Sequence, residues 1–270
     1  MRNYLSRIPL GNDKYAYDQA PVFAEAAEDA MRNIKKRWKR PLYFYHLRRG
    51  GHVAAVRSHL GSDFFGKIDL RRFYEQVSRN RIIKRLRSLG LDLADATDIA
   101  VQSTVLSPVK KPCGGDHYMV PYGFVQSALL ASIDMDKSQL GRVMTDIDKS
   151  DLNLSVYVDD IVVSGSDETP VSAALNLLRE AAATSHFPIN EEKSCDVRDT
   201  MNAFNIEFRN GHMAISQERM EEFQGQIMLS GDDDTNIAIL AYVHSVNQTQ
   251  AQDLFDALPR YLSCAAHILL

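Results

Sequence analysis

The sequence has little cysteine, no long apolar run and a net charge of only −4 over 270 residues. Its cysteines, Cys113, Cys195 and Cys264, form no CxxC pair, so neither a structural zinc site nor a disulfide framework is indicated. No stretch approaches the roughly 18 apolar residues of a membrane span, and no N-terminal apolar segment resembles a signal peptide. We therefore expect a cytoplasmic globular protein without a membrane partner.

The small net charge hides an asymmetry between the two halves of the chain. Residues 1–145 hold 24 Lys and Arg against 14 Asp and Glu, whereas residues 146–270 hold 7 against 21. Because affinity for phosphates follows the local field, the first half can bind a polyanion while carboxylates of the second half bind cations. The alternative is that the asymmetry reflects ordinary solvated faces. The basic residues expected to contact nucleic acid are Lys35, Lys36, Arg37, Arg40, Arg48 and Arg49.

Apolar periodicity and turn signals predict strand, helix, hairpin, helix and strand in that order over the middle of the chain. The expected helices span residues 24–40, 72–89, 124–144 and 171–185. The expected strands and hairpins are 41–61 around a Gly-Gly turn, 63–68, 105–122 around Gly114-Gly115, 154–165, 187–197, and 203–216 around Asn210-Gly211. Residues 230–235 are acidic and predict a linker before a last helical segment.

The stretch LSVYVDDIVVSG, residues 154–165, breaks a local rule. Asp159 and Asp160 stand between two strand-forming runs, where a hairpin turn favours Asn-Gly or Gly-rich pairs. At roughly 4 Å and an effective dielectric of about 20, two like charges repel by on the order of 4 kcal/mol. A divalent cation is the usual remedy for crowded carboxylates. Asp69, at the end of an earlier strand, can join the two if its strand lies in the same sheet, as in a polymerase palm.

At these residues the sequence resembles the reverse transcriptase family. YVDD at 157–160 is similar to the family's catalytic motif, and GKIDLRRFYEQV at 66–77 is similar to its first catalytic motif. VPYGFVQSALLASI at 120–133 resembles the segment that grips template and nucleotide, INEEKS at 189–194 the later lysine motif, and FNIEF at 204–208 the primer-grip hairpin. The likeness covers about residues 40–215 with its motifs in the family's order.

The resemblance implies the role of each matching residue. Asp69, Asp159 and Asp160 would be catalytic ligands of two Mg²⁺ ions, with Mn²⁺ as a possible substitute. Lys193 would stabilise or protonate the leaving pyrophosphate, although a lone lysine in a polar turn is equally often surface decoration. The residues implied at the nucleotide are Leu70, Tyr74, Tyr122, Gly123 and Gln126.

Three of these nucleotide-site residues have alternative interpretations. Tyr74 falls where an aromatic ring excludes a ribose 2′-hydroxyl, and the alternative is a core aromatic beside Phe73. Gly123 would let the backbone approach the nucleotide, and the alternative is a plain turn glycine. The family's usual Gln is Tyr122 here, so Gln126 is expected to supply the missing amide from one helical turn further on.

The implied fold is α/β (α+β), a right-hand polymerase palm with an antiparallel sheet. We expect an N-terminal helical and basic fingers part over residues 1–62 and a palm over 63–215, with an inserted fingers hairpin at about 100–122. Residues 216–270 are expected to form a short helical, thumb-like segment.

The PYGFVQS segment and the absence of further domains in the sequence make the chain most similar to the abortive-infection and defence-associated (unknown-group) reverse transcriptases of bacteria. This implies RNA-directed DNA synthesis from dNTPs in anti-phage defence, with a structured non-coding RNA as template and DNA as product. The short thumb-like segment predicts a partner protein, an RNA or self-association. The alternatives are an RNA-dependent RNA polymerase and a catalytically idle palm that scaffolds another polymerase subunit.

Overall fold

The computed structural model describes residues 2–11, 13–108, 116–230 and 232–257. The α-helices are α1 (Pro21–Arg37), α2 (Gly51–Arg57), α3 (Arg79–Ser88), α4 (Leu93–Gln102), α5 (Ser127–Asp136), α6 (Gln139–Asp148), α7 (Glu168–Thr184), α8 (Gln217–Leu229), α9 (Asp233–Val246) and α10 (Gln248–Asp256), with 3-10 turns η1 (Tyr45–Leu47) and η2 (Phe73–Gln76). The strands are β1 (Tyr4–Gly11), β2 (Lys14–Gln19), β3 (Phe64–Asp69), β4 (Val105–Leu106), β5 (Tyr118–Met119), β6 (Asn153–Tyr157), β7 (Asp160–Gly165), β8 (Cys195–Arg198), β9 (Met201–Ala203), β10 (Ile206–Arg209) and β11 (His212–Ile215). Among these described helices, none is both long and apolar enough to cross a membrane.

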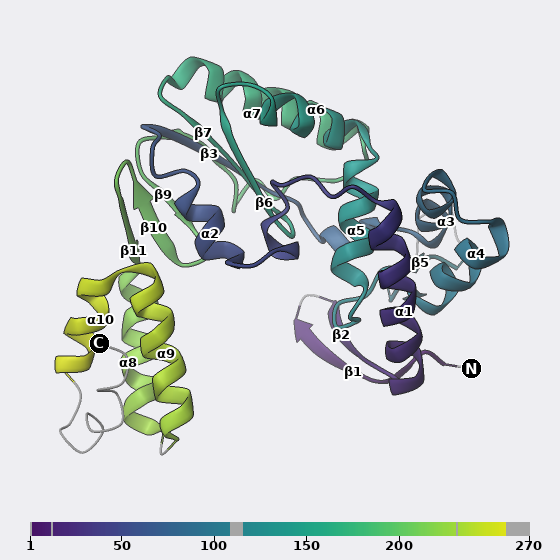
Figure 1. Ribbon diagram of the computed structural model, residues 1–270, viewed down its shortest axis with the longest axis horizontal. Coiled ribbons are helices and arrows are strands. Elements are labelled where there is room, and N and C mark those ends of the chain that lie inside the picture. The colour runs from purple at the N-terminus through teal and green to yellow at the C-terminus, as the bar shows by residue number, and fades with distance from the viewer. Residues whose placement is uncertain (1, 12, 109–115, 231, 258–270) are drawn as a thin grey trace.

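A four-stranded antiparallel sheet in the order β6-β7-β3-β8 forms the centre of the molecule. Helices α6 and α7 cover one face, and α2 with the β9–β11 sheet lies on the other (Figure 1). Ile161 and Val163 of β7 therefore enter one core and Val162 enters the other. Two covered faces explain why β7 is a continuous apolar run and not an alternating one. The mixed α/β fold with an antiparallel sheet, as predicted, is confirmed.

Close packing of helix α7 on the sheet depends on a glycine. A Cβ on Gly66 of β3 would lie 2.3 Å from Leu175 Cδ1 of α7. Any side chain at this position would push the helix away from the strand that ends in Asp69.

A buried histidine ties the two strands of the β6–β7 hairpin together. His59 Nδ1 lies 2.7 Å from Ser164 Oγ of β7, and its Nε2 lies 2.7 Å from Ser155 Oγ of β6. Burial lowers the pKa of His59 to about 3, so the imidazole is neutral and each ring nitrogen has a partner. The buried imidazole thus holds β6 and β7 together through two polar contacts inside an apolar layer.

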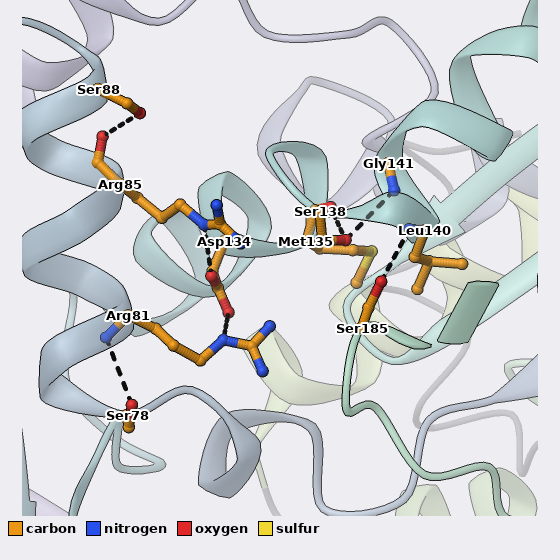
Figure 2. Close-up of polar contacts among 10 residues, drawn as sticks. All are labelled: Ser78, Arg81, Arg85, Ser88, Asp134, Met135, Ser138, Leu140, Gly141 and Ser185. Atoms are coloured by element: carbon orange, nitrogen blue, oxygen red, sulfur yellow. Dashed lines mark hydrogen bonds and ion pairs between the residues drawn. The ribbon is translucent and has the colours of Figure 1, made fainter. Parts of the chain in front are cut away.

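The fold also buries an ionic cluster between α3 and α5 (Figure 2). Asp134 of α5 is completely buried, and its carboxylate oxygens lie 2.6 Å from Arg81 Nε and 2.8 Å from Arg85 Nε of α3. The guanidinium of Arg81 also lies over the ring of Phe187, 4.6 Å from its centroid. The cluster joins the helices of the N-terminal half to α5, at whose N-terminus the PYGFVQS segment ends.

The helix predicted over 24–40 is confirmed as α1, and the helix predicted over 171–185 is confirmed as α7. The turn at Asn210-Gly211 joins β10 to β11 as expected. Strands β4 and β5 pair as the hairpin over 105–122 requires, while its predicted turn at Gly114-Gly115 lies outside the described residues.

The strand–turn–strand prediction for residues 41–61 is wrong. This segment forms η1 and the helix α2, and Gly50, with a φ of 90°, is the residue that precedes α2. The Gly-Gly pair therefore begins a helix, and does not connect two strands. Val53 and Val56, one helical turn apart, bury the inner face of α2 against the sheet.

The helices predicted over 72–89 and 124–144 each divide in two. The first is η2 followed by α3, and the second is α5 followed by α6. A serine begins each second helix: Ser78 Oγ accepts from the amide of Arg81, and Ser138 Oγ accepts from the amide of Gly141. The apolar pattern continues across both breaks, so periodicity alone does not reveal them.

Two further differences concern the N-terminal hairpin and the acidic stretch. The N-terminal hairpin of β1 and β2 was not expected. The acidic stretch 230–235 is not simply a linker, because Asp232 caps α9 by accepting from the amide of Asp234. The last predicted helical segment extends to residue 270, but residues 258–270 lie outside the described part.

Candidate active site

The register of the central sheet brings two of the predicted carboxylates together. Asp69, the last residue of β3, is the direct cross-strand partner of Asp160, the first residue of β7. Asp160 also pairs with Tyr157 of β6, so the two turn residues are Val158 and Asp159. The expectation that Asp159 and Asp160 both occupy the turn is therefore wrong by one residue. Opposite residues of an antiparallel pair share a face, and Asp159 lies at the edge beside them.

A histidine that the sequence reasoning missed holds this turn. Val158 has a φ of 60°, a conformation that a β-branched residue rarely adopts. Its backbone amide donates to His46 Nδ1 at 2.9 Å, and His46 Nε2 lies 2.8 Å from Ser132 Oγ of α5. Burial lowers the pKa of His46 to about 4, which keeps Nδ1 free to accept. A lone histidine within an aromatic segment carries no sequence signal for this role.

Burial and repulsion from neighbouring carboxylates make Asp159 and Asp160 costly to ionise. Asp69 is buried with 8% of its surface exposed, and Asp159 and Asp160 are half-buried. Burial raises the pKa of Asp160 to about 6; Lys67, whose Nζ lies 3.6 Å from Asp160 Oδ1, opposes this rise, and Asp159 and Asp69 add to it. The pKa of Asp159 is also raised, first by burial and then by Asp69. The protein alone thus leaves negative charge here that needs a counter-ion.

The donor set suits a hard divalent cation. The atoms are carboxylate oxygens, which Mg²⁺ and Mn²⁺ prefer, and Asp160 Oδ1 is buried without a hydrogen-bond partner. In the part of the chain that the structure describes, no three His, Cys, Asp or Glu side chains converge closely enough to hold an ion as they stand. The backbone register nevertheless places Asp69 directly opposite Asp160.

Two lysines from distant parts of the chain act on Asp159. Lys193 and Lys14 both lower the pKa of Asp159, which places both ammonium groups within electrostatic reach of it. Lys193 was predicted at this site. Lys14 stands at the start of β2 in the N-terminal hairpin and was not predicted, because nothing in its sequence neighbourhood connects it to Asp159.

Tyr74 and Tyr122 form an aromatic pair beside Asp159. Their ring centroids lie 4.8 Å apart with an interplanar angle of 79°. Burial raises the pKa of Tyr74 to about 12, with the negative charge of Asp159 as the next cause. The same two causes raise the pKa of Tyr122. Both phenols are therefore neutral, and both rings lie near the carboxylates.

The other predicted nucleotide-site residues are explained by packing. The side chain of Leu70 is buried in the main core, and its amide donates to the carbonyl of Asp159 at 2.9 Å. The Gln126 side chain is buried too, and its Nε2 donates to Ser103 Oγ at 3.1 Å. Gly123 has a φ of 99°, and a Cβ there would lie 2.4 Å from the carbonyl oxygen of Tyr17. The close approach at Gly123 is thus to the N-terminal hairpin.

Four of the six predicted nucleic-acid-binding residues line one hollow of about 790 Å³. These are Lys35, Arg40, Arg48 and Arg49, and the hollow also contains the aromatic side chains of Trp38 and His46. We call it the basic hollow. Since His46 also holds the Val158 turn, the basic hollow adjoins the hairpin that carries Asp159.

The remaining two predicted residues lie elsewhere on α1. Arg37 donates to Asn33 Oδ1 and, from its Nη1, to the carbonyl of Gly90 at 3.0 Å, so it braces α1 against the end of α3. Lys36 is exposed and does not line the basic hollow.

The predicted primer-grip segment begins at the turn between β9 and β10. Phe204 and Asn205 both have a φ of 61°, and the ring centroid of Phe204 lies 5.1 Å from that of Tyr157. The turn therefore contacts the strand that leads into the carboxylates. Phe204, Tyr157 and His52 line a second hollow of about 450 Å³ together with residues of α8 and α9.

Comparison with solved structures gives similarity of fold. The chain aligns with a foamy viral protease-reverse transcriptase in complex with double-stranded DNA at a TM-score of 0.50 and 12% identity, covering 97% of this chain and 43% of that one. It aligns with telomerase from Candida albicans, in complex with a fragment of telomeric RNA, at a TM-score of 0.45 and 12% identity, covering 93% of this chain and 48% of that one. The chain thus spans less than half the length of these proteins.

The sequence itself gives a family assignment. A search of curated proteins finds no match. The family model described as "Reverse transcriptase (RNA-dependent DNA polymerase)" matches residues 22–226, more than half of the chain and all the motifs discussed above. The chain belongs to the reverse transcriptase family.

Proposed function

We propose that this protein is an RNA-directed DNA polymerase that extends a DNA strand from dNTPs by metal-dependent nucleotidyl transfer. The observation that carries the proposal is the cross-strand pairing of Asp69 with Asp160, beside Asp159 in the turn. Phosphoryl transfer requires positioning and charge neutralisation, and needs no protein nucleophile. A cluster of buried carboxylates on rigid antiparallel strands meets that requirement.

Asp69, Asp159 and Asp160 would hold the divalent ions, Mg²⁺ or Mn²⁺. Such ions, when bound, lower the pKa of the attacking hydroxyl and neutralise the charge of the triphosphate. In the reaction the 3′-oxygen of the strand bonds to the α-phosphorus of the nucleotide, and the bond to pyrophosphate breaks. Lys193, within electrostatic reach of Asp159, is placed to stabilise or protonate that pyrophosphate, and Lys14 is placed to neutralise the same phosphates.

Tyr74 is the proposed sugar gate. Its ring lies close enough to Asp159 for the carboxylate to raise its pKa, which would place it beside a nucleotide held at the carboxylates. A ring at this place leaves no room for a ribose 2′-hydroxyl and so favours dNTPs. The aromatic contact with Phe73, at 5.5 Å between centroids, anchors the ring to the core and is compatible with both roles.

The basic hollow is the proposed contact for the nucleic-acid backbone. Its lining includes four cationic side chains, which suits it to bind phosphates. The turn at Phe204 and Asn205, in contact with Tyr157, is the proposed support for the growing strand.

We extend the proposal to the biological setting. The resemblance carried by the PYGFVQS segment supports a role in bacterial anti-phage defence, with a structured non-coding RNA as template. We divide the chain into fingers (residues 1–62), palm (63–215) and a thumb-like part (216–270). Among the described residues, the thumb-like part offers three short helices, α8, α9 and α10, to hold a duplex. A partner protein or a second copy of the chain is therefore expected to complete the grip.

The test is incorporation of labelled dNTPs or rNTPs with Mg²⁺ by the protein purified with its accompanying RNA and proteins. The Asp159→Asn, Asp160→Asn double variant is compared with an Asp146→Asn, Asp148→Asn control, which removes the same charge from the exposed face of α6. Labelled DNA that disappears in the first variant and persists in the control is the expected result, and sequencing the product identifies the template.

Other outcomes distinguish the alternatives. Incorporation of rNTPs in preference to dNTPs would identify an RNA-dependent RNA polymerase. A folded complex that incorporates neither, in wild type and variants alike, would favour the catalytically idle scaffold. The crowding of Asp160 with Asp159 and Asp69, which raises its pKa in spite of Lys67, argues against the scaffold, because a chain without need of a cation would gain stability by losing that charge.

A further inference from the structure

Tyr122 occupies the position where the family usually has Gln, and the structure gives it a definite contact. Its ring meets that of Tyr74 edge to face, with centroids 4.8 Å apart and an interplanar angle of 79°. This is a favoured geometry for aromatic pairs. A glutamine has no ring and cannot make the contact.

Tyr122 is itself held by the N-terminal hairpin. Its carbonyl oxygen accepts from the amide of Tyr17 in β2 at 2.8 Å, and Ala16 of β2 forms a parallel bridge with it. The next residue, Gly123, lies so close to β2 that a Cβ would be 2.4 Å from the Tyr17 carbonyl oxygen. Tyr17 is 3% exposed and belongs to a small core with Met119 and Phe124. The hairpin thus fixes the backbone from which the Tyr122 ring projects.

We propose that Tyr122 is a positioning residue that fixes the ring of Tyr74, and that the β1–β2 hairpin acts through it to set the selectivity between deoxyribose and ribose. This inference rests on the proposed function, in which Tyr74 is the sugar gate. The N-terminal hairpin therefore holds the ring of Tyr74 in place through Tyr122, a residue that departs from the family's pattern.

The kinetic test uses the ratio of kcat/KM for a dNTP to that for the matching rNTP, because the active fraction of each preparation cancels. Tyr122→Ala and Tyr122→Gln are expected to lower this ratio by about threefold to tenfold, the range that loss of one aromatic contact corresponds to. Tyr122→Phe keeps the ring and should keep the ratio. In a Tyr74→Ala background, Tyr122→Ala should have no further effect on the ratio. An unchanged ratio in Tyr122→Ala, or additive losses in the double variant, would overturn the inference.

The second measurement needs no catalysis. Fluorine-labelled tyrosine is incorporated into the full chain, and Tyr74→Phe identifies the Tyr74 resonance. Tyr122→Ala should shift that resonance and Tyr122→Phe should largely preserve it, while the far-ultraviolet circular dichroism of both matches wild type. If the Tyr74 resonance does not shift in Tyr122→Ala, the positioning role of Tyr122 is wrong, while the proposed function is unaffected. A wild-type protein that incorporates neither nucleotide defeats the proposed function and the selectivity claim together, even if the ring contact is confirmed.

Discussion

The Nδ1 atom of His46 accepts a hydrogen bond of 2.9 Å from the backbone amide of Val158. This single bond satisfies the donor of a β-branched residue with a φ of 60°, next to Asp159. Ser132 Oγ donates to the carbonyl of Ala128, so it accepts from the Nε2–H of His46, and the neutral tautomer is fixed from both sides. The backbone position next to Asp159 thus depends on the protonation of a buried imidazole.

Replacing His46 with Leu should destabilise the protein by about 1–3 kcal/mol, because the amide of Val158 loses its hydrogen-bond acceptor in a part-buried site. His46→Asn places an amide oxygen near the former Nδ1 and should recover part of the loss. Urea unfolding at pH 7.5 gives both values. Equal stability of the Leu variant and wild type would show that the bond does not hold the turn.

The same histidine predicts a pH dependence of stability. Its pKa of about 4 in the folded protein is lower than the ordinary value of 6.5, so below pH 6.5 the unfolded chain binds more protons. The free energy of unfolding should fall as the pH drops from 6.5 to about 4, by up to roughly 1.4 kcal/mol per pH unit for this group. His59, whose pKa is also lowered by burial, contributes the same kind of pH dependence to the stability of wild type and variant alike. The difference between wild type and His46→Leu therefore isolates His46, and parallel pH profiles would contradict its assignment.

Asp160→Asn should abolish nucleotide incorporation and yet stabilise the metal-free protein. The folded-state pKa of Asp160, about 6, lies above the ordinary 3.8, so its ionised form weakens the fold above pH 6. A gain of about 1–3 kcal/mol is expected at pH 8 with a chelator present, and it should disappear below about pH 3, where the carboxyl is protonated in both the folded and the unfolded chain. Added Mg²⁺ should raise the Tm of wild type more than that of the variant. Destabilisation at pH 8 would contradict the charge argument.

Much of the candidate site could be predicted because it depends on local rules. Asp69 ends an apolar strand, and Asp159 and Asp160 interrupt two strand-forming runs, so their functional character is visible in short windows of sequence. The one-residue shift of the turn was not visible, because register is set by the cross-strand pairing of Tyr157 with Asp160.

The remainder depends on tertiary contacts that periodicity does not encode. The Gly50-Gly51 pair reads equally as a hairpin turn or as the start of a helix, and the burial of Val53 and Val56 decides between them. Lys14 and Asp159 are brought together only by the packing of β2 on the segment before α5. Gln126, predicted at the nucleotide, is buried and donates from Nε2 to Ser103 Oγ, a contact that the sequence pattern does not reveal.

In the buried cluster of Figure 2, replacing one carboxylate oxygen of Asp134 with an amide nitrogen should cause a large loss of stability. Asp134→Asn leaves Arg81 and Arg85 without their counter-charge in a site where the carboxylate is fully buried. Breaking one partner of a buried ion pair typically costs about 3–5 kcal/mol. Glu222→Gln removes an exposed partner of Arg219 and should cost less than about 1 kcal/mol. A loss from Asp134→Asn as small as that of the control would show that the arginines find other partners or water.

The basic hollow gives a prediction that separates phosphate contacts from solvated charges. Arg49 and Lys35 line it, whereas Lys36 stands on the same helix as Lys35 and does not. Each phosphate contact contributes about 0.7–0.9 to the slope of log affinity against log salt. Arg49→Ala and Lys35→Ala should therefore each flatten the slope of RNA binding by about one unit. Lys36→Ala should leave the slope unchanged, although it removes the same charge. Equal flattening by all three substitutions would mean that the general field of the N-terminal half attracts RNA, and that the basic hollow has no special part in binding it.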